Sequence, residues 1–387
     1  MRKQMLVNEA VLGEERASEL LEQVILRNPK VTDVMLLQLA KVPLASIERS
    51  EAERTDILNR IPSARELPSH TLCVALMGFA IQRGATCTVA AVDEVLNERR
   101  ASRLMALLEA SLWVAGGLSL AQLVHLAGSM PAGHAASGWT VFGGAMLGLG
   151  AWVNRACVFG AVARLGSGEW AYAATPVGFY VGCLSVTALF GRPSATQLAQ
   201  GSPLFDAAPG FAMAFVAFVV WRSLPALSAW RKAGLVEWLQ QKVWAPHAAT
   251  VVIGVCFVGT LLLAGRWAYT DVLADLARAM DRQSAAAAVP LLPVLLLAAL
   301  YAGALIGGRT AGGWQSTRVT GAQLLRCFVG GVVMGWGSLL IPGSNDGLIL
   351  IGIPLLRPYA WLAFASMFGA IALAMQVSRT VRGDGQR

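Results

Sequence analysis

Long runs of apolar residues follow one another from residue 67 to residue 378, and most are close to the length that crosses a lipid bilayer. A membrane-spanning helix needs roughly 20 apolar residues, because each residue advances it by about 1.5 Å. The full-length runs lie at residues 104–126, 170–190, 211–221 with a lead-in from 204, 248–263, 290–306 and 359–377. Since backbone groups in lipid must bond within their own segment, these runs predict an all-α, polytopic membrane bundle.

The composition supports this interpretation. Apolar residues make up 56% of the 387 residues and charged residues only 14%, against about 25% charged residues in a typical soluble protein. Residues 1–66 differ, with 10 Lys or Arg and 11 Asp or Glu. We therefore expect a soluble helical N-terminal extension at 1–66, a transmembrane domain at 67–378 and a polar C-terminal tail at 379–387. A soluble enzyme and a disordered chain are excluded.

Four further segments share a different pattern, in which a Gly-rich apolar run is interrupted and then followed by a second, shorter apolar run. The interruptions lie at residues 83–86, 154–156, 264–266 and 342–343. Broken helices occur at membrane depth only where protein buries them or where they line a cavity, and they mark the central site of many transporters. The pattern predicts inverted-repeat-like pairs of short broken or re-entrant half-helices that meet at the bilayer midplane. Glycines that only let helices pack closely are the alternative.

Polar residues gather at these interruptions. Cys87, Cys157 and Ser344 each open a short apolar run, where a helix N-terminus presents unpaired N–H groups and a partial positive charge to an anion. A thiol or hydroxyl adds a further donor. The other candidate substrate-binding residues near the interruptions are Arg83, Arg155, Asn154 and Asn345. Helix capping is the alternative role for Asn154 and Ser344, and interfacial anchoring is the alternative for the two arginines.

Three stretches carry a resemblance to a known family. They read GFAIQRGATC at 78–87, GGAMLGLG at 143–150 followed by RAC at 155–157, and GGVVMGWG at 330–337 followed by PGSNDG at 342–347. Each is similar to one of the motifs of the YeeE/YedE (sulfur transport) family, and the second is the most specific. The resemblance extends from about residue 72 to residue 375 and leaves the N-terminal extension outside.

The resemblance implies a helical bundle with inward-dipping short helices that imports thiosulfate or a related sulfur-containing inorganic anion. It implies that central cysteines pass the substrate inward through S–H···S hydrogen bonds, and two of those positions carry over as Cys87 and Cys157. The third departs from the family, because Ser344 stands where its last motif, usually Gly-Cys-Thr-Ser-Gly-His-Gly, has a cysteine. We also expect a cytoplasmic sulfur-carrier protein as a partner.

Two other classes of function stay open as alternatives. A membrane scaffold or partner subunit without transport would explain the apolar runs but not four interruptions around cysteines. An intramembrane hydrolase would pair Ser344 with His125, His134 or His247. We expect a transporter rather than an enzyme, with no metal or other cofactor and no nucleic-acid partner, since no cysteine and histidine spacing suits zinc.

Basic residues predict the orientation. Arg99, Arg100 and Arg103 follow one apolar run, and a second basic stretch covers residues 222–242. Because cytoplasmic loops of membrane proteins carry an excess of Lys and Arg, both stretches are expected in the cytoplasm. The N-terminal extension has no apolar export signal, so we place the N-terminus in the cytoplasm and the protein in the inner membrane.

Overall fold

The computed structural model describes residues 67–126, 130, 133–191, 196–198, 202–233, 243–265, 267–280, 291–312, 314, 316–341 and 343–384. The predicted extension at 1–66 lies outside these residues, as do Arg266 and Pro342 of two predicted interruptions. The chain divides into two units, Met1–His70 and Thr71–Arg387, and nearly all described residues belong to the second.

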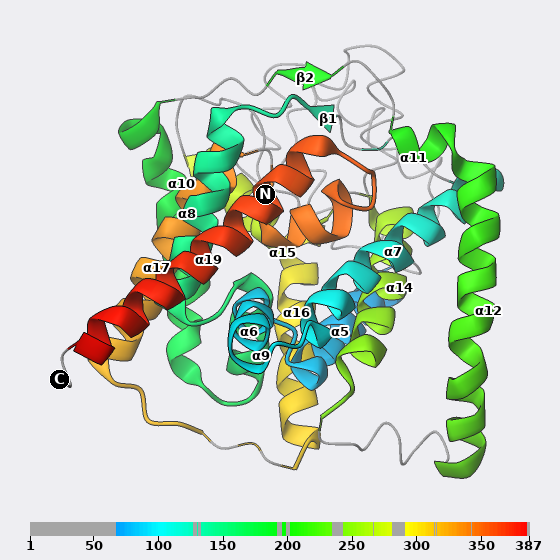
Figure 1. Ribbon diagram of the computed structural model, residues 1–387, viewed down its shortest axis with the longest axis horizontal. Coiled ribbons are helices and arrows are strands. Elements are labelled where there is room, and N and C mark those ends of the chain that lie inside the picture. The colour runs from blue at the N-terminus through cyan, green and yellow to red at the C-terminus, as the bar shows by residue number, and fades with distance from the viewer. Residues whose placement is uncertain are drawn as a thin grey trace, which may run out of the picture. The chain divides into compact units, whose positions relative to one another are not determined.

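Long helices make up most of the described chain (Figure 1). They are α5 (Leu67–Gly84), α7 (Ser102–Leu123), α8 (Gly138–Asn154), α10 (Ala174–Phe190), α12 (Ala208–Ala233), α14 (Pro246–Ala264), α16 (Leu291–Thr310), α17 (Gly321–Leu340) and α19 (Pro358–Asp384). Within the described residues, 8 helical segments are long and apolar enough to cross a membrane. The prediction of an all-α polytopic bundle is therefore confirmed.

Short helices follow the interruptions that the sequence predicts. They are α6 (Thr88–Asp93) with its continuation η2 (Glu94–Glu98), α9 (Val158–Gly166), α15 (Tyr269–Met280), and α18 (Asn345–Gly347) with its continuation η4 (Leu348–Gly352). The remaining elements are small: η3 (Trp170–Ala173), α11 (Pro203–Asp206), and an antiparallel pair of two-residue strands, β1 (Gly133–His134) and β2 (Gln197–Leu198).

The order of a long helix, a short helix and a long helix occurs four times along the described chain, in α5–α7, α8–α10, α14–α16 and α17–α19. The short helices pack reciprocally between these groups. Helix α6 contacts α19 while η4 contacts α7, and α9 contacts α16 while α15 contacts α10. Figure 1 shows α6 and α9 between α8, α17 and α19 on one side and α5, α7 and α14 on the other. The inverted-repeat relation of the groups stays a prediction.

Glycines let α8 and α17 approach each other closely. A Cβ atom added to Gly150 would lie 2.8 Å from the carbonyl oxygen of Gly330, and one added to Gly330 would lie 2.7 Å from the backbone nitrogen of Asn154. Both distances are shorter than carbon atoms tolerate, so larger residues here would push the helices apart. The glycine runs therefore allow close helix packing, and they hold the end of α8, where the chain breaks, against α17.

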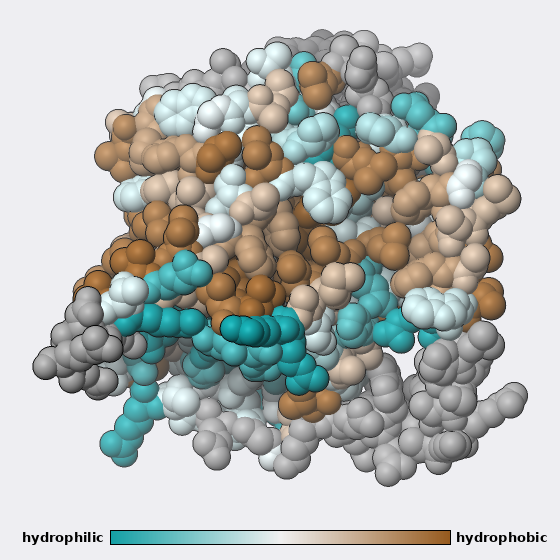
Figure 2. All heavy atoms as spheres, in the orientation of Figure 1, coloured by the Kyte–Doolittle hydropathy of each residue, from teal (hydrophilic) through white to brown (hydrophobic). Residues whose placement is uncertain are grey.

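The surface agrees with a bilayer setting. Figure 2 shows apolar residues across the middle of the visible face and hydrophilic residues gathered over α6, α9 and the C-terminal part of α19. Helix α19 continues through Arg379 to Asp384, so this part of the predicted C-terminal tail is helical. Arg379 lies 3.7 Å from the carboxylate of Asp93, an ion pair that joins this end of α19 to α6.

Candidate functional site

Three of the short helices begin without a side-chain cap. Cys87, Cys157 and Ser344 are the N-cap residues of α6, α9 and α18, and their carbonyl oxygens accept the first helical hydrogen bonds at 3.0, 2.8 and 2.7 Å. None of their side chains accepts a capping bond from the helix. In contrast, α17 begins with a capping box in which the hydroxyl of Thr320 accepts from the N–H of Gln323. A helix start without a cap leaves N–H groups available to another partner.

The two cysteines lie side by side. The side chains of Cys87 and Cys157 are in hydrogen-bond contact, and the backbone N–H of Thr88 donates to Sγ of Cys157 at 3.2 Å. Gly160 provides the space, because a Cβ atom there would lie 2.5 Å from Sγ of Cys87. Cys157 is fully buried, and Cys87 borders a cavity. The two thiols therefore lead from the edge of a cavity into the protein interior.

A hydroxyl and carboxylate cluster surrounds Ser344. The hydroxyls of Ser344 and Thr270 both donate to the carboxylate of Asp346, and the two hydroxyls also contact each other. The backbone N–H of Thr270 donates to the second carboxylate oxygen at 3.3 Å. All three residues are buried. Because Ser344 uses its hydroxyl on a neighbouring side chain, the alternative of a simple helix cap does not describe it.

Asn345 connects the cysteines to this cluster. Its Oδ1 atom accepts from the hydroxyl of Thr88, which follows Cys87, at 3.5 Å. Its Nδ2 atom is buried and has no hydrogen-bond partner among the described residues. Buried amide donors without partners are rare in folded proteins, so this N–H group is available to a bound molecule. We call the connected set the central junction: Cys87, Thr88, Cys157, Thr270, Ser344, Asn345 and Asp346.

A large cavity of about 950 Å³ reaches the central junction at Cys87. Four arginines and two carboxylates line it, so the formal charge of its wall is positive: Arg103, Arg155, Arg164 and Arg326 against Asp93 and Glu169. Arg164 is paired with Glu169 at 3.2 Å. The exposed Arg155 ends α8 in a left-handed conformation, with φ of 60°. The cavity is large enough for a small inorganic anion with its water shell, and its arginines would attract one.

A second, small cavity of about 10 Å³ borders the junction at Asp346. Its other walls are apolar or aromatic, from the end of α14 to the start of α15 and from α5, α9, α16 and η4. Tyr269 stands in this wall and donates its hydroxyl to the carbonyl oxygen of Val158 at 3.1 Å. The junction thus borders the large cavity at Cys87 and the small cavity at Asp346.

Three predicted site residues lie outside the central junction: Arg155, which lines the large cavity, Asn154 and Arg83. Asn154 donates to the carbonyl oxygen of Ala156 at 2.8 Å and accepts from the hydroxyl of Thr175 at 3.0 Å, so it braces the break itself. Arg83 is buried, donates to the hydroxyl of Thr310 at 2.9 Å and lies over the ring of Phe79. Their roles in substrate binding stay predictions. The junction instead includes Thr88 and Thr270, which the sequence did not single out.

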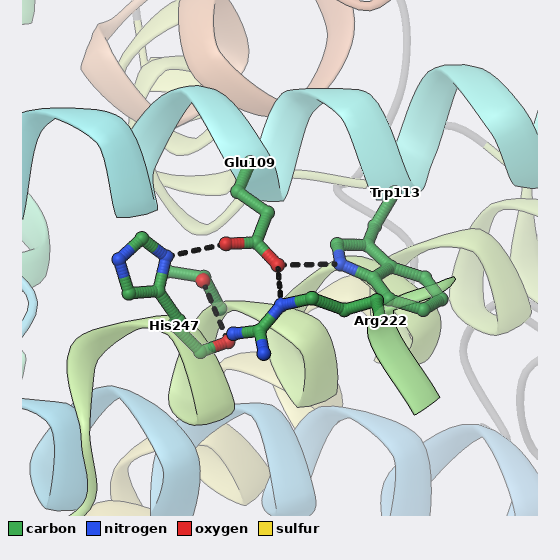
Figure 3. A network of polar contacts seen from close by, with 5 residues as sticks. Glu109, Trp113, Arg222 and His247 are labelled. Atoms are coloured by element: carbon green, nitrogen blue, oxygen red, sulfur yellow. Dashed lines mark hydrogen bonds and ion pairs between the residues drawn. The ribbon is translucent and has the colours of Figure 1, made fainter. Parts of the chain in front are cut away.

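A separate polar network occupies the contact between α7, α12 and α14 (Figure 3). The carboxylate of Glu109 accepts from Nε of Arg222 at 3.1 Å, accepts from the indole N–H of Trp113 at 3.4 Å and contacts Nδ1 of His247. We call these four residues the Glu109 network. His247 therefore contacts a carboxylate on α7, whereas the described partners of Ser344 are Thr270 and Asp346, with no histidine among them. The histidine that the hydrolase alternative requires beside Ser344 is not among its described partners.

Comparison with known proteins identifies the family. The family described as "Sulphur transport" matches residues 83–373, which includes the helix starts at Cys87, Cys157 and Ser344. The chain belongs to the sulphur transport family. A second family, a domain of unknown function (DUF8299), matches residues 16–93. The chain is also 23% identical, over 333 residues, to the thiosulfate transporter TsuA of Escherichia coli (strain K12). The match covers 77% of this chain and 91% of that protein.

Membership in the sulphur transport family confirms the resemblance drawn from the three motifs. The matched region includes every residue of the central junction and the four short helices. With its apolar helices, the protein is a multi-pass membrane protein of a transport family whose substrate class is a small anion containing sulfur.

Proposed function

We propose that this protein imports thiosulfate or a related sulfur-containing inorganic anion across the inner membrane, past Cys87, Cys157 and the Ser344 cluster. The observation that supports this proposal is that polar groups follow one another without a gap through the central junction. Sγ of Cys87 contacts Sγ of Cys157, and Thr88 joins Cys157 to Asn345. A substrate anion would exchange one set of donors for the next without leaving polar contacts.

The groups in the junction suit an anion that carries both oxygen and a terminal sulfur atom. Thiols are weak, polarisable donors that match sulfur, whereas the amide Nδ2 of Asn345 and the hydroxyls match oxygen. The four arginines of the large cavity supply positive charge at one end of the path. Arg103 belongs to the basic stretch that the positive-inside rule puts in the cytoplasm, so we place the large cavity on that side.

Uptake by the full-length protein in proteoliposomes tests the proposal. We expect accumulation of radiolabelled thiosulfate, with unlabelled thiosulfate competing better than chloride or phosphate, and sulfite and sulfate included to set the substrate range. Cys87→Ala and Cys157→Ala should each abolish or strongly reduce uptake while the protein remains folded. Cys256→Ala is the matched control, because Cys256 is a buried thiol on α14 outside the central junction. Normal uptake in both junction variants would refute the role of the cysteines.

A further inference from the structure

Asp346 is a buried carboxylate that has no cationic partner within the described part of the chain. Its side chain is 3% exposed, and its described hydrogen-bond partners are the neutral groups of Thr270 and Ser344. Charged side chains within a membrane are costly, and those that persist usually face a cavity and have a function. Asp346 faces the small cavity, so its position calls for an explanation beyond packing.

Among the residues that the structure describes, none that lines the small cavity beside Asp346 carries a positive charge. Titratable groups that interact electrostatically with it are Tyr269 on α15 and Tyr301 on α16. The rest of the cavity wall is apolar or aromatic, from α5, α14, α16 and η4, and among its described lining residues there is no Lys, Arg or His. The small cavity of about 10 Å³ therefore brings no cationic side chain to Asp346 from its described lining.

An ionised Asp346 conflicts with the passage of an anion in two ways. Its negative charge repels the substrate in a low-dielectric setting, where like charges interact strongly. It also holds the hydroxyls of Ser344 and Thr270 as donors, so neither is available to the substrate. A protonated Asp346 removes both obstacles, because the neutral acid needs fewer donors and itself offers an O–H. Beside it, the unpartnered Nδ2 of Asn345 provides a second donor at the same place.

We propose that Asp346 binds a proton when the anion enters the central junction and releases it after the anion has passed, so that uptake is coupled to inward proton movement. This inference rests on the proposed function and adds its driving force. In the ionised state the Ser344 cluster closes the path, and in the protonated state it offers donors to the substrate. The proton and the anion thus cross together, which also reduces the net negative charge that moves through the membrane.

Proteoliposomes that contain the full-length protein and a trapped pH-sensitive dye test the coupling. An inward-directed proton gradient of about one pH unit should raise thiosulfate accumulation about tenfold for each proton coupled. Addition of thiosulfate without a gradient should acidify the interior. Asp346→Asn cannot bind or release a proton, so any thiosulfate exchange that it retains should show neither the gradient effect nor the acidification. Asp275→Asn, on the exposed side of α15, is the matched control and should behave as the unchanged protein.

The outcomes separate this inference from the proposed function. If the unchanged protein moves no sulfur anion under any gradient, the proposed function fails. If it moves thiosulfate without acidifying the interior, or if Asp346→Asn keeps the gradient effect, proton coupling through Asp346 is overturned. Asp346→Glu guards against a variant that does not fold. It keeps a titratable acid, so it should restore acidification if Asp346→Asn is inactive, and failure to do so in a folded, exchanging protein counts against the inference.

Discussion

Glu109 and Asp346 are carboxylates in the membrane part of this protein, and their described partners differ. Glu109 contacts Arg222, His247 and Trp113, so its negative charge is compensated by side chains from two other helices. Asp346 contacts only the neutral Thr270 and Ser344 among the described residues. Glu109 stands within the regular helix α7, whereas Asp346 stands in the short α18, directly after a break.

The difference separates a structural charge from one that can change. The guanidinium of Arg222 compensates the charge of Glu109, and loss of that carboxylate leaves a partly buried cation without this partner. A carboxylate held by hydroxyls can take up a proton while its neighbours rotate, because a hydroxyl both donates and accepts. We therefore expect changes in the Glu109 network to affect the stability of the α7, α12 and α14 contact, and changes in the central junction to affect transport.

The largest expected effect comes from filling the space beside Cys87. In Gly160→Ala the new methyl group would lie 2.5 Å from Sγ of Cys87, so the thiol must leave its contact with Cys157. We expect uptake of thiosulfate to fall on the order of 100-fold, the size of loss that a misplacement of about 1 Å causes in sites that depend on geometry. The measurement is the initial uptake rate in proteoliposomes at matched protein content.

Gly259→Ala is the control for this change. Gly259 lies on α14, the helix that carries His247, and its added methyl group would be 3.4 Å from Sγ of Cys73, an ordinary contact. Uptake by this variant should be nearly unchanged. Equal losses in the two glycine variants would mean that the site depends on general helix packing rather than on the two thiols.

A smaller effect is expected from neutralising Glu109. Glu109→Gln keeps the shape of the side chain but removes the charge that compensates Arg222 and the contact that orients His247. We expect a loss of about 1–3 kcal/mol in stability, the cost of leaving buried polar groups poorly paired, seen as a lower midpoint of thermal unfolding in detergent. Thiosulfate uptake and its dependence on a proton gradient should persist. If uptake by this variant no longer responded to a proton gradient, Glu109 would share the role proposed for Asp346.

The positions of the helix breaks could be predicted from the sequence, but the residues that contact each break from other helices could not. Glycine, asparagine and proline after apolar runs mark helix ends through local backbone preferences, and the structure ends α5 at Gly84, α8 at Asn154, α14 at Ala264 and α17 at Leu340. The contact of Thr270 with Asp346 joins residues 76 positions apart, and only the packing of α15 against α18 creates it. Sequence patterns within a single segment do not show which residues of α15 and α18 lie opposite each other.

Closeness to a break also does not determine where a side chain lies. Arg83 and Asn154 flank breaks as Cys87 and Cys157 do, yet their described contacts are with Thr310, Phe79, Ala156 and Thr175. The Glu109 network was missed for a related reason. A single carboxylate hardly lowers the hydropathy of a run of 22 residues, and its cationic partners come from two helices more than 100 positions away.

The smallest expected effect concerns Ser344, where this chain departs from its family. A hydroxyl is a stronger donor than a thiol but a less polarisable partner for a terminal sulfur atom. Ser344→Cys should therefore raise thiosulfate uptake relative to sulfite or sulfate by about threefold to tenfold, the ratio that corresponds to one modest hydrogen bond. Ser344→Ala should lower uptake of the native substrate. It should also shift the pH dependence of uptake, because Asp346 loses one of its two hydroxyl donors. The measurement is competition among the three anions in proteoliposomes over a range of pH.

The alternative is that Ser344 acts only as a helix cap, which contributes ~1 kcal/mol to stability and nothing to selectivity. Unchanged anion ratios in both variants, with a lower unfolding midpoint for Ser344→Ala, would assign Ser344 to the structural side of the comparison, together with Glu109.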